Sequence, residues 1–138
     1  MKITSADIKR LVLVRLNPGD DILLSLREAV QREGLKNALI LEGVGSCITH
    51  HYHVVSSGDL PPEETFSKAE APADIVNING FVINGRVHSH IIFCNDKVAY
   101  GGHLEEGVTV LTFAIIVLAE VDADLEHYDR CGCIEDFT

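Results

Sequence analysis

Two short segments of the sequence gather the residues best suited to bind a metal ion. They are Arg86-Val87-His88-Ser89-His90 and Tyr100-Gly101-Gly102-His103-Leu104. Side chains alternate faces along a β-strand, so His88 and His90 are expected to point the same way, about 6.6 Å apart. Two such imidazoles can share one ion at about 2.0–2.1 Å, and His103 on a neighbouring strand would supply a third. Three protein ligands leave one position open, as in a catalytic rather than a structural site.

A predicted hairpin would bring these histidines together. Residues 86–94 form a strand-like run rich in branched and aromatic side chains, and Asn95-Asp96-Lys97 predicts a tight turn after it. The segment that carries His103 would then run back beside the first strand, where cross-strand neighbours lie about 5 Å apart. We therefore expect a divalent transition metal here, with zinc as the leading choice, although imidazole suits nickel, copper or iron comparably. The alternative is that each histidine is an ordinary strand residue satisfied by a hydrogen bond.

Other residues are weaker candidates for the same chemistry. Glu42 is a candidate further ligand or acid–base group and Arg86 a candidate anion clamp, although a solvated or structural role suits both equally. A second histidine group is more simply a polar strand face, and it could reach the same pocket only if its strand lies beside the hairpin; its members are His50, His51 and His53. The segment Glu105-Glu106-Gly107 is predicted to be a solvated turn.

Composition limits the function classes. The 138 residues, with 46% hydrophobic and 23% charged residues, predict a single domain over 1–138. The net charge of −10 and the scattered basic residues argue against independent binding of duplex DNA. No apolar run approaches the roughly 20 residues of a membrane span, and residues 1–5 lack signal-peptide features, so we expect a cytoplasmic protein.

The four cysteines are predicted to be reduced in that compartment. Cys47 and Cys94 lie within apolar runs and are expected to be buried small hydrophobes. Cys131 and Cys133 are expected to be a reduced pair on a tail, and a redox pair or soft-metal ligands are the alternatives.

The remaining pattern predicts an α+β domain with one principal helix on a mainly antiparallel, barrel-like sheet. Apolar residues recur at helical spacing between Asp20 and Gly34, which suit the start and end of a helix. Asn84-Gly85 is a two-residue hairpin signal. Residues 57–72 are predicted to be an exposed loop with at most a short edge strand. The other strand predictions are 11–16, 39–45, 47–56, 74–83, 86–94 and 108–121, with a bend at Gly43-Val44-Gly45.

Several of these motifs together resemble the plants-and-prokaryotes-conserved (PPC) domain over about residues 8–121. They are Val14-Arg15-Leu16-x-x-Gly19-Asp20-Asp21, Gly43-Val44-Gly45-Ser46, His88-Ser89-His90 and Gly101-Gly102-His103-Leu104-x-x-Gly107-x-x-Val110. The resemblance implies a compact α+β domain that forms a homotrimer, with the histidines near a subunit interface. Plant members carry an AT-hook that binds DNA, and no AT-hook occurs in these 138 residues. The family's Thr-Thr-Ala-Glu run is Thr112-Phe113-Ala114-Ile115 here, so any role of that glutamate does not carry over.

A more distant likeness is to α-acetolactate decarboxylases, which bind zinc through the same histidine layout. On that analogy His88, His90 and His103 would hold the ion. Three functions follow from these patterns. The first is a metal-binding PPC-domain protein that holds a small molecule or serves as an assembly module. The second is a DNA-binding or transcription-associated protein, and the third is a metal-dependent lyase or hydrolase.

Overall fold

One helix and six strands make up the described part of the chain, residues 1–130 of this computed structural model. In chain order they are β1 (Ile8–Leu16), α1 (Ile22–Arg32), β2 (Ala38–Val55), β3 (Glu64–Ile83), β4 (Arg86–Cys94), β5 (Ala99–Leu104) and β6 (Val110–Val121). The predicted α+β class is confirmed. Among the described residues there is no helix with the length and apolar character needed to cross a membrane.

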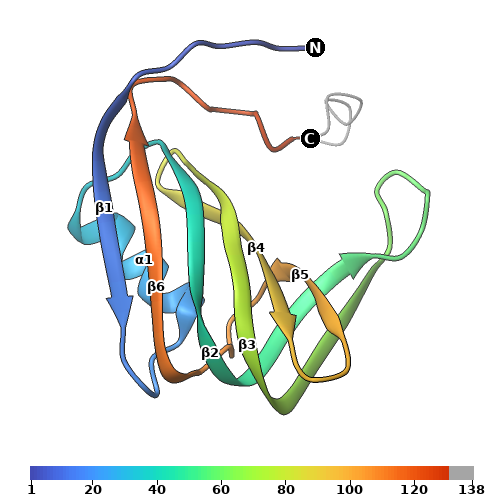
Figure 1. Ribbon diagram of the computed structural model, residues 1–138. Helices are drawn as coiled ribbons and strands as arrows, with labels where there is room; N and C mark the ends of the chain where they lie inside the picture. Colours follow the sequence, from blue (N-terminus) through green and yellow to red (C-terminus); the bar gives the residue numbers. More distant parts are fainter. Residues whose placement is uncertain (131–138) are drawn as a thin grey trace.

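The strands form one antiparallel sheet in the order β1-β6-β2-β3-β4-β5. A further pairing joins the end of β2 to β5, where Tyr52 pairs with Leu104 and His53 with His103. Strands β2 to β5 therefore close into a ring, while β1 and β6 extend the sheet to one side (Figure 1). The ring makes the fold barrel-like at the end that carries the histidines.

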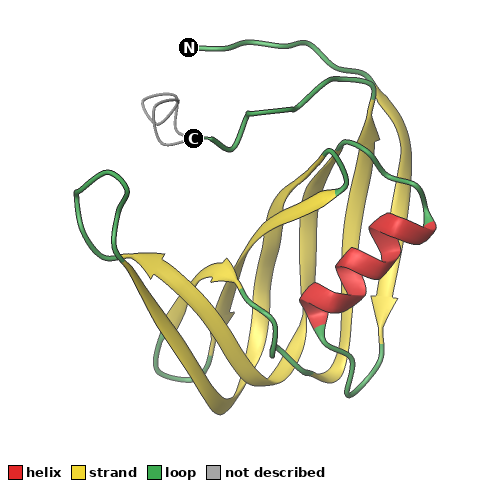
Figure 2. Cartoon of the chain, turned by 180° about the vertical axis from the view of Figure 1, so that it is seen from behind, coloured by secondary structure: helices red, strands yellow, loops and turns green. Residues whose placement is uncertain are grey.

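Helix α1 begins where the sequence predicts it. The side chain of Asp21 accepts a hydrogen bond from the backbone N–H of Leu24 and so caps the first turn. Ile22, Leu26 and Val30 form its buried stripe, which packs on one face of the sheet. In the described part of the chain the helix covers one face of the sheet only, which is the near face in the view from behind (Figure 2).

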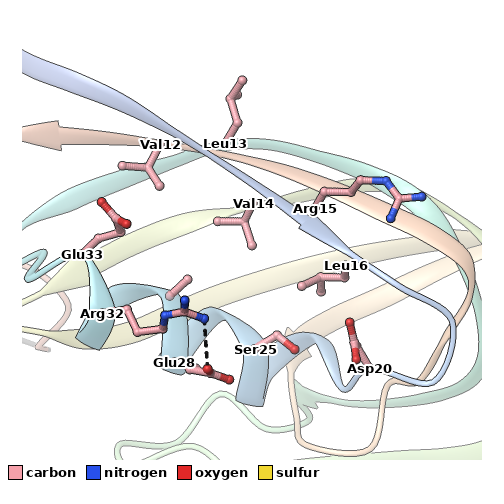
Figure 3. A pocket seen from close by; sticks show the side chains of 11 residues that line it. Val12, Leu13, Val14, Arg15, Leu16, Asp20, Ser25, Glu28, Arg32 and Glu33 are labelled. Atoms are coloured by element: carbon pink, nitrogen blue, oxygen red, sulfur yellow. Dashed lines mark hydrogen bonds and ion pairs between the residues drawn. The ribbon is translucent and has the colours of Figure 1, made fainter.

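Strand β1 shows how the two faces of the sheet differ. Val12, Val14 and Leu16 point toward α1 and line a hollow of about 360 Å³ between strand and helix, whereas Leu13 points away (Figure 3). The side chains of Leu13 and its cross-strand neighbour Val117 lie on the outer face, and Leu13 is 71% exposed. The inner face is thus the core, and the outer face exposes apolar side chains at this edge of the sheet.

Two predictions about the first half of the sheet were wrong. Residues 39–45 and 47–56 are not two strands with a bend between them but one strand, β2, with irregular register near Gly45. A Cβ on Gly45 would lie 2.2 Å from the carbonyl oxygen of Phe113, so this glycine permits close approach of β6 rather than a bend. The sequence predicted a bend because glycine within a strand can mark either a bend or the close approach of another backbone.

The predicted loop 57–72 is also largely strand, because β3 begins at Glu64. Pro72 interrupts no strand pairing, because it lies in a register shift between β2 and β3. The pairs on either side of this shift are Cys47 with Ala73 and Thr49 with Glu70. Proline is tolerated in a sheet at such a bulge. The helix, the hairpin at Asn84-Gly85, the turn after Cys94 and the final strand are confirmed.

Candidate metal centre

The three histidines singled out by their spacing converge on the outer face of the ring. His88 and His90 lie on the same face of β4, and His90 is the direct cross-strand partner of His103 on β5. One donor atom from each imidazole lies within 4.8 Å of the others. The ring of His103 lies edge-on to both of the others, with centroids 4.8 Å from that of His88 and 5.4 Å from that of His90.

This donor set fits a divalent transition metal. Ligand atoms around a tetrahedral ion with bonds of about 2.0–2.1 Å lie roughly 3.4 Å apart, so small side-chain rotations suffice. The imidazoles must be neutral to bind. Burial, followed by the neighbouring histidines, lowers the pKa of His103 to about 4, so its ring is neutral at pH 7. Burial likewise lowers the pKa of His90.

A fourth histidine joins the cluster because β2 closes the ring. The ring of His53 stacks on that of His103, with centroids 4.5 Å apart. Its Nδ1 lies 2.7 Å from a carboxylate oxygen of Glu105, and its Nε2 lies 3.4 Å from Glu64. His53, His103 and Glu105 also present donor atoms within 4.8 Å of one another. The segment predicted as a plain solvated turn therefore supplies a carboxylate to the site.

On the other side of the cluster, the C-terminal segment contacts His88. The Nδ1 atom of His88 lies 3.1 Å from Oδ2 of Asp129, and Nη2 of Arg86 donates to the same oxygen at 2.5 Å. Burial opposes ionisation of Asp129, but the hydrogen bonds from Arg86 and His88 prevail and hold its pKa below the usual value. Its second oxygen is buried without a partner among the described residues. Such an oxygen is costly unless water or an ion satisfies it.

The histidines form the floor of a polar cleft of about 630 Å³. His88 and His90 also border an adjacent, more apolar pocket of about 370 Å³, which includes Phe81 and Tyr128. The side chains that line the polar cleft are those of His53, Val54, Val55, Glu64, Arg86, His88, His90, His103 and Asp129. A small polar molecule would thus find cationic, anionic and imidazole groups beside an apolar wall.

Of the other predicted candidates, Glu42 and His51 lie outside this cleft and Arg86 lies within it. Glu42 is exposed and pairs with Val117 on the outer face of the sheet, outside the residues that line the clefts around the histidines. Arg86 lies in the cleft, but it holds Asp129 rather than facing an open anion site. His51 shares a strand face with His53, but its Nδ1 contacts the backbone oxygen of Glu106 at 2.5 Å.

Three further predictions concern groups away from the cluster. His50 is not on a polar strand face: it is buried inside the ring against Tyr52, Phe93 and Tyr100, and burial lowers its pKa. Cys47 is buried as expected and Cys94 is half-buried. The predicted pair Cys131 and Cys133 lies outside the described residues.

Sequence reasoning missed Glu64, Glu105 and Asp129 and left His53 as a conditional candidate. His53 could have been found from the alternation of His51 and His53, given the pairing of β2 with β5. Glu105 follows His103 by two residues, so its place next to the histidine motif was a signal in the sequence. Asp129 carries no pattern, because it reaches the site through an irregular segment 41 residues from its partner.

Three of the solved structures that resemble this chain illustrate the likeness. A metal-containing protein from Archaeoglobus fulgidus is 20% identical with a TM-score of 0.78, and the match covers 90% of this chain and 88% of that one. A plant- and prokaryote-conserved (PPC) protein from Pyrococcus horikoshii is 21% identical with a TM-score of 0.72, covering 90% and 87%. A candidate DNA-binding protein from Bacteroides thetaiotaomicron is 17% identical with a TM-score of 0.73, covering 86% and 83%.

At these identities the likeness shows the shared fold alone. No curated protein matched the chain. The family model of the Plants and Prokaryotes Conserved (PCC) domain matches residues 3–122, which is most of the sequence. The motifs that suggested this family from the sequence lie within that range, and the chain belongs to the PCC, or PPC, domain family.

Proposed function

We propose that this protein is a metal-binding PPC-domain module that uses His88, His90 and His103 to hold one divalent transition-metal ion, with zinc as the expected ion. The observation that carries this proposal is the convergence of three imidazole donors within 4.8 Å, from two strands in direct register. A sheet holds such ligands rigidly, since the geometry is set by backbone pairing rather than by loops. The likeness to a metal-containing protein of the same fold is consistent with it.

The ligand proposed for this module is a small molecule with a polar, anionic or carbonyl group. Three protein ligands leave the ion open toward the polar cleft, and a bound metal would supply Lewis acidity there. Glu64, which lines the cleft, and Glu105 each contact a ring nitrogen of His53 and can accept a hydrogen bond from it. The apolar pocket with Phe81 and Tyr128 can take a hydrocarbon part of the same ligand.

Metal content tests this proposal. Protein purified without chelators is expected to contain about one transition-metal ion per chain, measured by mass spectrometry of the elements. His103→Ala should lose it, because the central ligand of the cluster is removed. His51→Ala is the matched control, since His51 lies on the neighbouring strand but outside the donor cluster. Metal-free wild-type protein that takes up none of Zn²⁺, Ni²⁺, Cu²⁺ or Fe²⁺ would overturn the proposal.

We further propose that the module assembles as a homotrimer through the outer face of its sheet. Cross-strand pairs place Leu11, Leu13, Val44 and Ile115 on that face, opposite α1, and each is at least 38% exposed. Several large apolar side chains exposed on one face of a sheet are unusual on a protein that remains a monomer. A second copy of the chain is the expected partner, because its apolar face can pack against this one without complementary charges.

Light scattering after size-exclusion chromatography tests the assembly. The wild-type chain of 15.1 kDa is expected at about 45 kDa. Leu13→Glu places a charge on this apolar face, so the dissociation constant of the trimer should rise at least tenfold and the population should shift toward monomer. Leu24→Glu, at an exposed position on the helix, should leave the mass unchanged. A monomeric wild-type protein would contradict the assembly.

A metal-dependent lyase or hydrolase is the second candidate function. The observation that favours it is the pair formed by His53 and Glu105, which stands against the proposed ligand His103. It predicts turnover that is lost on chelation and restored by metal. A DNA-associated role is the remaining alternative, and the net charge of −10 leads us to expect no salt-sensitive binding to duplex DNA.

A further inference from the structure

The segment that follows β6 runs back past the ends of the strands and returns to β4. It places Asp129 against His88, 41 residues earlier in the sequence. The carboxylate is nearly buried, since 10% of the side chain is exposed. Asp129 also lies beyond residues 3–122, the range matched by the family model, so the segment that follows the matched domain supplies this contact.

The geometry fixes which nitrogen of His88 carries a proton. A carboxylate can only accept a hydrogen bond, so the 3.1 Å contact requires a proton on Nδ1 of His88. In the neutral ring the lone pair is then on Nε2, which is the atom left free to bind an ion. A carboxylate in this position also orients the ring and increases the basicity of the ligating nitrogen.

Arg86 fixes the carboxylate in turn. Its Nη2 donates to the same oxygen, Oδ2, that accepts from His88. Arg86 begins β4 two residues before His88, so its side chain lies on the same strand face. Arginine, carboxylate and imidazole therefore form a chain of charge-assisted hydrogen bonds that ends at Nδ1 of His88 and leaves Nε2 of the same ring for the ion.

We propose that Asp129 is a positioning residue, which sets the tautomer and orientation of His88 for metal binding from outside the conserved domain. This inference rests on the proposed metal site. It assigns a function to Arg86 that differs from an anion clamp for substrate, because the arginine anchors the protein's own carboxylate. Loss of such an outer carboxylate typically weakens metal binding about 10- to 100-fold.

Titration with Co²⁺, followed by its visible absorption, tests the effect on metal binding. Asp129→Asn should weaken Co²⁺ binding about 10- to 100-fold and change the absorption envelope, whereas Asp129→Glu should recover part of the affinity. Glu126→Gln removes the same charge from the same segment without touching His88, and it should bind as the wild type does. Equal affinity in Asp129→Asn and wild type, with binding abolished in His103→Ala, overturns this inference but leaves the proposed function intact.

A second measurement does not depend on metal. In the metal-free wild-type protein, long-range proton–nitrogen NMR at a pH where His88 is neutral should show the Nδ1–H tautomer. Asp129→Asn should shift the population toward Nε2–H. Wild-type His88 found in the Nε2–H form overturns the inference whether or not the protein binds metal. Wild-type protein with the Nδ1–H tautomer but without Co²⁺ uptake overturns the proposed metal site, and the positioning role with it.

Discussion

At the scale of single residues, the chemistry of this protein depends on side chains kept neutral by burial. His90 and His103 have lowered pKa values chiefly because the fold removes water from their rings. The same principle acts on Cys47, where burial raises the pKa of the thiol to about 11. Burial keeps an imidazole neutral, with a lone pair that can bind a metal. It also keeps a thiol protonated, and so removes the reactive thiolate.

Cys47 is therefore expected to be inert in the folded protein. In a variant in which the other cysteines are serine (Cys94, Cys131 and Cys133), reaction with a disulfide reagent at pH 8 should be at least about 100-fold slower than in urea, because the thiolate is scarce and shielded. Spectrophotometric thiol counting measures this. Equal rates in native and unfolded protein would contradict the buried position.

At the scale of elements, close backbone approach brings β4 and β5 to their places. Gly80 on β3 has a φ of +149°, and a Cβ there would lie 2.1 Å from the carbonyl oxygen of His88. The sequence predicted the hairpin of β4 and β5 because turn residues and apolar alternation are local signals. The closure of β2 onto β5 was not predicted, since it joins residues about 50 positions apart and depends on the coiling of the sheet.

Gly80→Ala is expected to destabilise the fold and to disturb the metal site together. The added methyl must displace β4 at His88, at a cost of about 2–4 kcal/mol in the free energy of unfolding, measured with urea. Metal affinity of the folded fraction should fall as well. Gly58→Ala is the control, because a Cβ at Gly58 meets open space and should change stability by less than about 0.5 kcal/mol. Equal stability of the two variants would show that the approach at Gly80 is not tight.

At the scale of the whole molecule, the fold divides into a core face that the sequence predicts well and an outer face that it predicts only in part. The helix and most strands followed from periodicity, and the three histidines followed from spacing on adjacent strands. His53 reaches the site because β2 closes the ring, and Asp129 reaches it through an irregular segment. Such contacts depend on tertiary structure, so no local sequence pattern predicts them.

The buried imidazoles also predict how stability of the whole metal-free protein depends on pH. The folded-state pKa of His103 is about 4, below the ordinary value of 6.5, so the unfolded chain binds the proton more readily. The stabilising contribution is then present above about pH 6.5 and is lost as pH falls toward 4. The free energy of unfolding, from urea titrations at pH 7.5 and 5.0, should fall more in wild type than in His103→Gln. Parallel decreases would contradict the burial of this ring.

The central claim is that one ion binds between His88, His90 and His103. The most direct test is an anomalous-difference map from crystals of zinc-loaded protein, with data collected on both sides of the zinc absorption edge. One strong peak per chain is expected, bounded by the three imidazoles and about 2.0–2.1 Å from one nitrogen of each. A map with no peak at these histidines, or with its strongest peak at other residues, would contradict the proposed metal site.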